Sequence, residues 1–402
     1  MKEVSGLPRD WMWVKLGEVC RTTSGGTPSR REPEYYNGNI PWVKSGELDR
    51  GVITDTEEKI SEAAIKNSSA KVFPKGTLLI ALYGATIGKL AFLGVDAATN
   101  QAICGIYQNE KISSFFLYNY LFYKKQKLVG QGIGGAQPNI SQTILKELDL
   151  PLPPKATQEA IVSKIEELFS ELDKGIENLR TAQQQLKTYR QAVLKWAFEG
   201  NEKTGTPFSE IILSYQNGIS KRSATEGEPF KVLRLADIKG GEINSKEPRE
   251  IKLSKSEIEK YKLNDNDIIA IRVNGSKELV GRFVLVNTKN EWAFCDHFIR
   301  IRLDNKMALP EFIKYYAESR SVRRFIELNM VSSAGQNTIS QTTLSSLEIK
   351  LPSIEEQNKT VQEIESRFIV ADKMEESITQ SLQQAEALRQ SILKKAFEGR
   401  LS

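Results

Sequence analysis

The chain has 402 residues, of which 40% are apolar and 27% charged, and its formal net charge is +5. This length exceeds one ordinary hydrophobic core, so we expect a globular protein of two to four domains. No apolar run approaches the roughly 18 to 20 residues of a membrane span, no signal peptide is evident, and three lone cysteines argue against a disulfide framework, so a cytoplasmic location is expected.

The first region, residues 1–139, contains short apolar runs such as 77–82, separated by Gly, Asn and Asp. This pattern is typical of short strands in a curved, partly open sheet. The region ends in an aromatic-rich stretch, 115–128, that predicts a helix.

Two glycine-containing loops of this region suit contact with a polyanion. The stretch 24–31 combines small residues, hydroxyls and two guanidinium groups, which we interpret as a flexible loop that lets the backbone approach phosphate. The stretch 84–89 resembles a P-loop but lacks its spacing and its Ser or Thr. Taken singly, each of these residues is more often part of an ordinary loop than a DNA contact. The candidate DNA contacts here are Thr27, Ser29, Arg30, Arg31, Lys44, Tyr83, Thr86, Lys89, Asn100 and Gln101.

The segment 140–200 predicts three elements in succession. A short helix capped by Ser141 precedes a strand-like run, 148–153, whose prolines stop it before a long helix from about 157 to 199. Apolar residues recur there every seven positions, which indicates a coiled-coil seam. The seam is formed by Ile165, Leu172, Leu179, Leu186 and Val193; a second row contains Ile161, Leu168, Ala182, Tyr189 and Trp196.

The region 201–338 is similar in kind to the first, with apolar runs at 267–271, 283–286 and 298–301 and a helical stretch at 310–328. Residues 42–44 align with 232–234, 47–48 with 237–238, and Gly88 with Gly281. The candidate DNA contacts here are Lys221, Arg222, Arg234, Arg272, Asn274, Lys277, Arg282 and His297. Because His297 is the sole histidine, paired-histidine metal sites are excluded; we expect no metal site and a non-catalytic chain.

The segment 140–200 returns as 339–399 with 26 of 61 positions identical. The second helix, about 356–400, has its own seam, marked by Ile364, Ile378 and Ile392. Such helices cannot bury their seams alone, so we expect them to pair with each other, parallel or antiparallel, rather than each with a separate helix. The repeated segments 151–200 and 351–402 carry net charges of 0 and −2, whereas 1–150 and 201–350 carry +3 and +4. This weak basic excess allows an anionic partner on the divergent regions.

These features in this order resemble the specificity subunit of a type I restriction–modification enzyme, over essentially the whole chain. The resemblance is carried by Gly25-Gly26-Thr27-Pro28-Ser29, by 40–48, 76–81, 100–102, 137–141 and 150–154, and by the helix ending at 194–200. The second half departs from the pattern where Arg234 replaces the lysine and Asp296-His297 replaces Asn-Gln.

The resemblance implies an α+β fold with two target recognition domains, 1–150 and 201–350, joined by an antiparallel coiled coil with an internal pseudo-two-fold. Each domain would read one half of an asymmetric, split DNA site, and the spacers 151–200 and 351–402 would set the gap. Two methyltransferase subunits with S-adenosylmethionine, and restriction subunits with ATP and magnesium, would be the partners, and this chain would bind no cofactor. The alternatives are a recognition subunit of a related methyltransferase system outside type I, and a coiled-coil scaffold that binds proteins.

Overall fold

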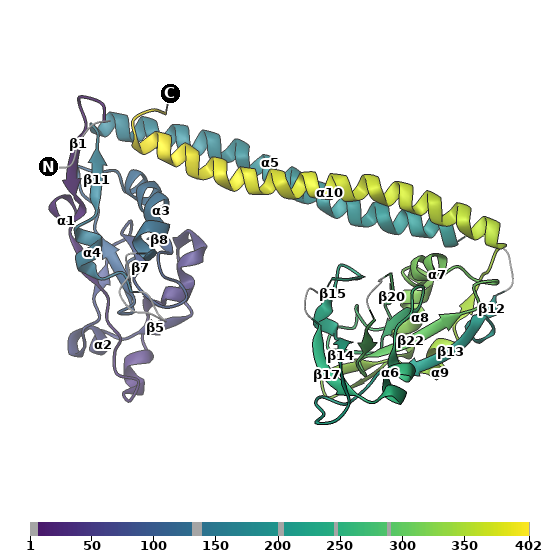
Figure 1. The fold of residues 1–402 in the computed structure, drawn as a ribbon. Coiled ribbons are helices and arrows are strands. Elements are labelled where there is room, and N and C mark those ends of the chain that lie inside the picture. Colours follow the sequence, from purple (N-terminus) through teal and green to yellow (C-terminus); the bar gives the residue numbers. More distant parts are fainter. Residues whose placement is uncertain (1–6, 131–138, 200–204, 245–247, 288–290, 402) are drawn as a thin grey trace. The chain divides into compact units, whose positions relative to one another are not determined.

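The computed structural model describes residues 7–130, 139–199, 205–244, 248–287 and 291–401. The chain divides into two compact units: unit 1 comprises Met1–Leu179 with Gln380–Ser402, and unit 2 comprises Arg180–Thr379. Each unit therefore contains a globular part and portions of both long helices (Figure 1). The glycine-rich sequence 132–135 and positions 137–138 of the resemblance lie outside the described residues.

The globular part of unit 1 is built on a five-stranded sheet, β2-β10-β7-β8-β4, and a four-stranded sheet, β5-β3-β9-β6, with β1 paired to β11. The apolar run at 77–82 forms β7, all four residues of which are buried, as its continuous apolar character predicts. The strands are β1 (Met12–Lys15), β2 (Thr22–Ser24), β3 (Ile40–Val43), β4 (Val52–Ile53), β5 (Glu58–Ile60), β6 (Val72–Phe73), β7 (Leu78–Ala81), β8 (Leu90–Leu93), β9 (Ala97–Thr99), β10 (Ile103–Ile106) and β11 (Asp149–Leu152). The helices are α1 (Leu16–Val19), η1 (Pro33–Tyr36), η2 (Ser45–Arg50), α2 (Glu62–Asn67), α3 (Ser114–Gly130) and α4 (Gln142–Lys146).

Unit 2 repeats this plan with a four-stranded sheet, β13-β22-β18-β20, a three-stranded sheet, β17-β14-β21, and a second three-stranded sheet, β19-β24-β23. Its strands are β12 (Thr206–Pro207), β13 (Ile212–Asn217), β14 (Glu228–Leu233), β15 (Ile238–Lys239), β16 (Glu242–Ile243), β17 (Arg249–Leu253), β18 (Ile268–Ile271), β19 (Val273–Asn274), β20 (Phe283–Leu285), β21 (Ala293–Phe294), β22 (Phe298–Leu303), β23 (Val331–Ser333), β24 (Gln336–Thr338) and β25 (Glu348–Ile349). Its helices are η3 (Phe208–Ile211), η4 (Leu235–Asp237), α6 (Lys255–Tyr261), α7 (Pro310–Ala317), α8 (Arg320–Asn329) and α9 (Gln341–Ser345). The helical stretch expected at 310–328 is thus two helices, because Ser319 takes an extended conformation that interrupts the first and begins the second.

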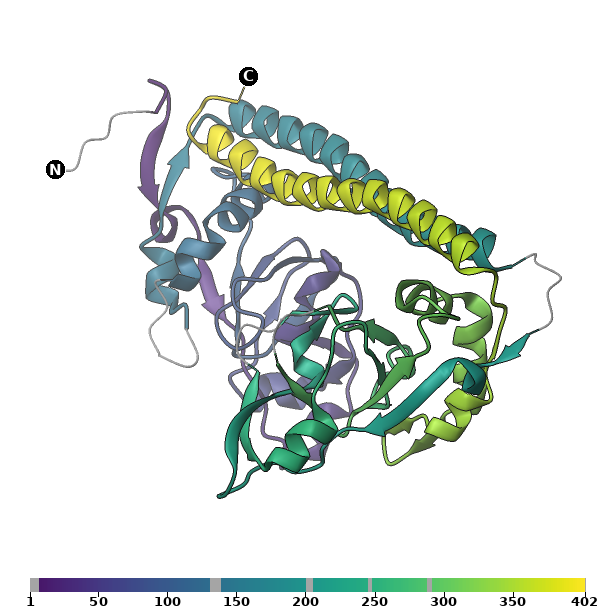
Figure 2. The same ribbon diagram turned by 45° about the vertical axis from the view of Figure 1, so that its right-hand side comes forward.

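Helices α5 (Lys155–Phe198) and α10 (Ile354–Phe397) each have 44 residues and are about 65 Å long, and they lie side by side in both views (Figures 1 and 2). The expected cap is present, because Ser141 begins α4; its counterpart in the repeat, Ser340, begins α9, and Ser353 and Glu356 form a capping box before α10. Every seam residue predicted on α5 and α10 is buried or half-buried, as a coiled coil requires. The second row is only partly right, because Tyr189 and Trp196 are exposed.

The two helices pair with each other and run antiparallel. In unit 1, Asp173 of α5 forms an ion pair with Arg389 of α10, and in unit 2, Arg190 of α5 contacts Asp372 of α10 at 2.5 Å. Moving forward along α5 therefore means moving backward along α10. The pairs are related by the 199-residue repeat, which gives the coiled coil its internal pseudo-two-fold.

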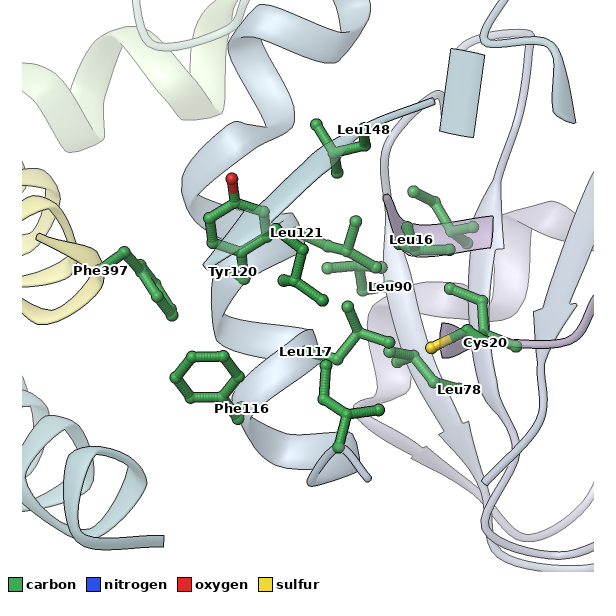
Figure 3. Close-up of a cluster of buried hydrophobic side chains, with 14 of the residues drawn as sticks. Leu16, Cys20, Leu78, Leu90, Phe116, Leu117, Tyr120, Leu121, Leu148 and Phe397 are labelled. Atoms are coloured by element: carbon green, nitrogen blue, oxygen red, sulfur yellow. The ribbon is translucent and has the colours of Figure 1, made fainter. Parts of the chain in front are cut away.

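The end of each long helix packs into the globular part of the opposite copy. Phe397 of α10 is buried against α3, with its ring 5.2 Å from Phe116 and 4.9 Å from Tyr120 (Figure 3). In unit 2, Phe198 of α5 packs against Phe312 and Tyr316 of α7, both at 5.3 Å. Each helix is therefore anchored at its C-terminal end by an aromatic residue of the repeat.

Among the described residues, no helix is both long and apolar enough to cross a membrane.

Candidate nucleic-acid interface

The loop 24–31 of unit 1 is held firmly, contrary to the flexible loop that we expected. The indole of Trp42 donates to the carbonyl of Gly26 at 3.1 Å, and the hydroxyl of Tyr36 donates to the carbonyl of Pro28 at 2.6 Å. A side chain at Gly25 would collide with Thr99, and one at Gly26 would collide with Ser69 and Ala70. These glycines are therefore required by packing inside the fold.

Four of the predicted contacts come together beside this loop. The hydroxyl of Thr27 donates to the amide oxygen of Gln101, and the hydroxyl of Tyr83 also interacts with Gln101. The neighbouring Asn100 accepts a hydrogen bond from the backbone N–H of Ala102 at 3.2 Å, which fixes its amide. Thr27 and Gln101 are exposed, so this cluster presents an oriented hydroxyl and amide groups to a ligand.

Most of the predicted cations of unit 1 are already paired. Arg30 contacts Glu58 at 2.7 Å and lies over the ring of Tyr36 at 4.1 Å, while Lys44 contacts Glu57 at 2.9 Å and Glu58 at 3.1 Å. The hydrogen bond from Arg30, assisted by the one from Lys44, lowers the pKa of the Glu58 carboxyl. Arg30 and Lys44 thus hold β5 and the loop together.

Arg31 differs from its neighbour. Its side chain is exposed, and within the described parts of the chain its guanidinium has no ion-pair partner. Its backbone N–H is fixed by the hydroxyl of Ser29 at 3.3 Å. In the β7–β8 turn, by contrast, Lys89 is paired with Asp49, and Thr86 is half-buried.

The corresponding site of unit 2 has different chemistry on the same backbone framework. The N–H groups of Asn100 and Cys295 donate to Val43 and Leu233 respectively, at 3.0 Å in both units. Gln101 therefore corresponds to Asp296. From the sequence we expected Asn100-Gln101 to match Asp296-His297, so that alignment is wrong by one position. The helical turns after these strands do match as expected: Glu47 and Asp237 each accept the N–H of the residue three positions earlier, at 2.8 Å.

Around Asp296 the structure gathers three of the predicted contacts. Arg222 contacts its carboxylate at 3.3 Å, Arg272 donates to its carbonyl at 3.2 Å, and Nδ1 of His297 lies 3.2 Å from its carboxylate. The Thr27–Gln101 pair of unit 1 is thus replaced in unit 2 by an Arg222–Asp296 ion pair.

The other predicted contacts of unit 2 are more dispersed. Lys221 contacts Glu257 of α6 at 3.0 Å, Arg234 contacts Asp237 at 3.3 Å, and Arg282 contacts Glu318 at 3.8 Å, so these three cations stabilise the fold. In the β19 loop, Asn274 accepts the N–H of Ser276 at 2.8 Å. Lys277 in the same loop is exposed, and its ammonium has no ion-pair partner among the residues that the structure describes.

The group Cys295, Asp296 and His297 places a sulfur, a carboxylate oxygen and an imidazole nitrogen within 4.8 Å of one another. Burial raises the pKa of the Cys295 thiol, and Arg222 occupies the carboxylate. Because a metal prefers the thiolate and an unshared carboxylate, this arrangement disfavours metal binding, and the expected absence of a metal remains a prediction.

Sequence reasoning missed the two buried glutamines that join each globular part to its long helix. Gln158 donates to the carbonyls of Lys111 and Pro153 at 3.0 and 2.9 Å and accepts the N–H of Ser113 at 2.7 Å. Gln357 makes the same three bonds with Met307, Pro352 and Leu309. The sequence does contain a signal for these residues, because Gln158 and Gln357 occupy equivalent positions, 199 residues apart, and are identical in the two copies of the repeat.

Together these features define a class of internally duplicated proteins in which one fold occurs twice, each copy carries different exposed loop chemistry, and two antiparallel helices are shared. The family model for the type I restriction modification DNA specificity domain matches residues 8–180 and 221–384. The chain therefore belongs to the family of type I restriction–modification specificity subunits, and DNA recognition follows from that family.

Individual relatives agree with this assignment. The chain is 31% identical to the specificity subunit of the type I restriction enzyme StySPI of Salmonella potsdam, over 98% of this chain and 90% of that subunit. It is 27% identical to the EcoKI specificity subunit of Escherichia coli K12, with the same shares covered. Among solved structures, it resembles a chain from work on complex assembly and conformational transition of the type I R-M system, with a TM-score of 0.78 and 21% identity over 98% of this chain and 99% of that one. The HsdS subunit from Thermoanaerobacter tengcongensis gives a TM-score of 0.60 and 20% identity over the whole of both chains. At this identity the structural likeness shows the fold.

Proposed function

We propose that this chain is the non-catalytic subunit that gives a type I restriction–modification complex its DNA sequence specificity. The globular part of each unit reads one half of a split, asymmetric DNA site. The coiled coil sets the spacer between the half-sites and binds two methyltransferase subunits. S-adenosylmethionine belongs to those subunits, and ATP and magnesium belong to restriction subunits, so this chain itself holds no cofactor.

The observation that carries the proposal is that the two globular parts share the same backbone hydrogen bonds at the candidate interface but carry different side chains there. Backbone bonds at Asn100 and Cys295 are equivalent, yet the groups beside them are an exposed hydroxyl–amide pair in unit 1 and an ion pair between exposed Arg222 and half-buried Asp296 in unit 2. Amides and guanidinium groups read base edges with different preferences, amides suiting adenine and arginine suiting guanine. Two readers of this kind favour an asymmetric site.

The coiled coil supports the role of a spacer. Its helices are anchored at their ends by Phe198 and Phe397, and they are fixed against sliding by the pairs Asp173–Arg389 and Arg190–Asp372. A seven-residue seam locks the axial register of two helices. A structure of fixed length is what a defined gap between half-sites requires.

Exposed apolar side chains on the same helices support partner binding. A few isolated ones are normal on any protein, and among the described residues six of the sixteen exposed large apolar side chains lie on this pair of helices. They are Tyr189, Trp196, Ile369, Val370, Met374 and Leu388. In unit 1 a hollow of about 630 Å³ is lined by Phe92, Phe115, Tyr118 and Phe169, with acidic side chains of α5 along its border. Apolar surface of this kind favours a protein partner such as a methyltransferase subunit.

The test is to express the chain with its methyltransferase subunits and to map methylated adenines across the host genome by sequencing. The expected result is one bipartite motif with two different halves and a constant gap. Duplexes carrying that motif should bind the complex in gel shifts at moderate salt in preference to duplexes with either half scrambled. Assembly with the methyltransferase but no preference for any sequence would contradict the proposal and favour a protein-binding scaffold. Methylation or cleavage by the purified chain alone would contradict its non-catalytic role.

A further inference from the structure

Unit 2 contains an exposed β-hairpin that includes none of the candidate DNA contacts described above. It consists of β23 and β24, with Ser332 opposite Asn337 and Ser333 opposite Gln336. Its two turn residues, Ala334 and Gly335, have φ values of +47° and +76°. Positive φ at both central positions is typical of the tight type I′ turn, which continues the twist of both strands.

The tip of this hairpin is unusually open. All residues from 331 to 336 are exposed, and the side chain of Val331 is 67% exposed. A Cβ added at Gly335 would meet no other atom within 4 Å. The tip thus presents the hydroxyl of Ser333, the amide of Gln336 and the apolar side chain of Val331 on a narrow two-stranded ribbon.

Buried hydrogen bonds fix the base of the hairpin to the basic β19 loop. Asn337 is only 5% exposed, and its amide donates to the carbonyls of Asn274 and Gly275 at 3.3 and 3.0 Å. Its amide oxygen accepts the hydroxyl of Ser332 at 2.6 Å. The N–H of Ile339 donates to the carbonyl of Arg272 at 2.9 Å. The ribbon is therefore held in one position beside Arg272 and Lys277, and binding would not have to order it.

The chemistry of the tip suits the edges of DNA bases. The major groove accepts a two-stranded β-ribbon, a glutamine amide pairs with the N6 and N7 atoms of adenine, and an aliphatic side chain contacts the methyl group of thymine. Serine hydroxyls bind phosphate or base edges, and cations at the base of the ribbon neutralise the phosphate backbone. Gln336, Val331, Ser333 and Lys277 supply these four kinds of group.

We propose that the β23–β24 hairpin is a base-reading element of unit 2 and that Gln336 is its principal specificity-determining side chain. This inference rests on the proposed function. In unit 1 the bridge between Tyr83 and Asn139 corresponds to the pairing of Val273 with Thr338, so the framework that holds the hairpin occurs in both units. The residues preceding Asn139 lie outside the described part of the chain.

The test uses the complex with its methyltransferase subunits and compares Gln336→Ala with a double variant, Ser333→Ala and Gln336→Ala. The matched control is Asn305→Ala, which removes another exposed amide of unit 2 at the far end of β22, about 20 Å of strand away from His297. Three duplexes are needed: the intact site, one with the first half-site scrambled and one with the second scrambled. Thermal unfolding establishes that the variants fold as the wild type does.

The expected result is that the hairpin variants lose about tenfold of the preference for an intact second half-site, while the preference for the first half-site is unchanged. Methylation mapping should show one relaxed position in the second half of the motif. Preferences equal to those of Asn305→Ala would overturn the inference, and so would an equal loss on all three duplexes, which indicates phosphate contact alone. Failure of the variants to assemble with the methyltransferase would assign the open edge of β23 to a protein partner instead. A wild-type complex without any half-site preference would refute the proposed function rather than this inference.

Discussion

The cations of the two candidate interfaces divide into those that are paired within the fold and those that remain available to a ligand. Arg30 and Arg31 are adjacent in sequence, yet Arg30 is engaged by Glu58 and by the ring of Tyr36, whereas the guanidinium of Arg31 extends into solvent. A positively charged side chain already paired with a carboxylate contributes little to counterion release, because its charge is compensated before DNA arrives. The contribution of each arginine to DNA affinity therefore follows from its partners.

We expect Arg31→Ala to weaken DNA binding and to reduce the slope of log affinity against log salt by about 0.9, the loss of one phosphate contact. The measurement is a salt titration of binding with the assembled complex. Lys155→Ala is the matched control, because it removes from α5 in the same unit one exposed positive charge that has no ion-pair partner among the described residues. A variant with the wild-type slope would show that Arg31 does not contact phosphate.

Arg30→Ala should instead lower the thermal stability of unit 1, since it removes the pairing with Glu58.

The buried glutamine Gln158 allows a second prediction at this scale. Its replacement by Ala leaves the N–H of Ser113 and the carbonyls of Lys111 and Pro153 without their partner in a buried position. We expect the free energy of unfolding of unit 1 to fall by about 1–3 kcal/mol, measured by urea denaturation. Gln184→Ala, at an exposed position of the same helix, should have little effect. Equal effects of the two substitutions would mean that the bonds of Gln158 are not needed for stability.

At the scale of elements, local patterns predicted the helices and the buried strands well. Seven-residue periodicity located the seam of α5 and α10, because only the chain's own spacing is needed to place apolar residues on one face. Ser141 marked the start of α4 for the same reason, because a capping serine lies next to the helix that it begins. The orientation of the two helices could not be obtained this way, since parallel and antiparallel pairing bury the same seam.

The features that sequence reasoning missed depend on residues far apart in the chain. The loop 24–31 is rigid because Tyr36 and Trp42 bond to it, and no local property of its glycines indicates this. The correspondence of Gln101 with Asp296 is defined by backbone bonds to different strands, so an alignment of side-chain types placed it one residue away. The position of Arg222 against Asp296, 74 residues apart, likewise follows only from the fold.

The coiled coil gives a prediction about length. Seven residues inserted after Leu179 in α5 and seven after Thr379 in α10 would leave the contacts within each unit intact, because these are the boundaries between the units. A heptad preserves the seam and adds about 10 Å to the helices, roughly three base pairs of DNA. Methylation mapping should find both half-site sequences unchanged and the spacer lengthened by about that amount.

The matched control for this prediction inserts two residues at each of the same two places. Two residues turn a helix by about 200°, so the seam that follows the insertion faces away from its partner and the pairing is disturbed. We expect that variant to unfold at a lower temperature and to methylate poorly. An unchanged spacer in the heptad variant would show that the distance between half-sites is set by something other than helix length.

At the scale of the whole molecule, each unit combines the globular part of one copy with the helix end of the other. Phe397, at the end of the second copy, is buried among Phe116, Tyr120 and Tyr123 of the first, and Phe198 is buried by the second copy in the same way. Anchoring through repeated residues lets the divergent loops change without disturbing the helices. This arrangement explains how a duplicated chain can keep its long helices similar while the loops of its two globular parts differ.

Exchange of one globular part should therefore change one half of the recognised site. We predict that replacing residues 1–150 with the corresponding domain of another specificity subunit gives a complex whose first half-site is that of the donor and whose second half-site and spacer are unchanged. The donor must retain aromatic residues at the positions of Phe116 and Tyr120, because Phe397 packs against both. Its backbone must also offer Gln158 the carbonyl of residue 111 and the N–H of residue 113. A donor with alanine at the two aromatic positions serves as the control, and it should destabilise unit 1 by removing the anchor of α10. Methylation mapping decides the outcome: a change in both half-sites would contradict independent reading by the two units.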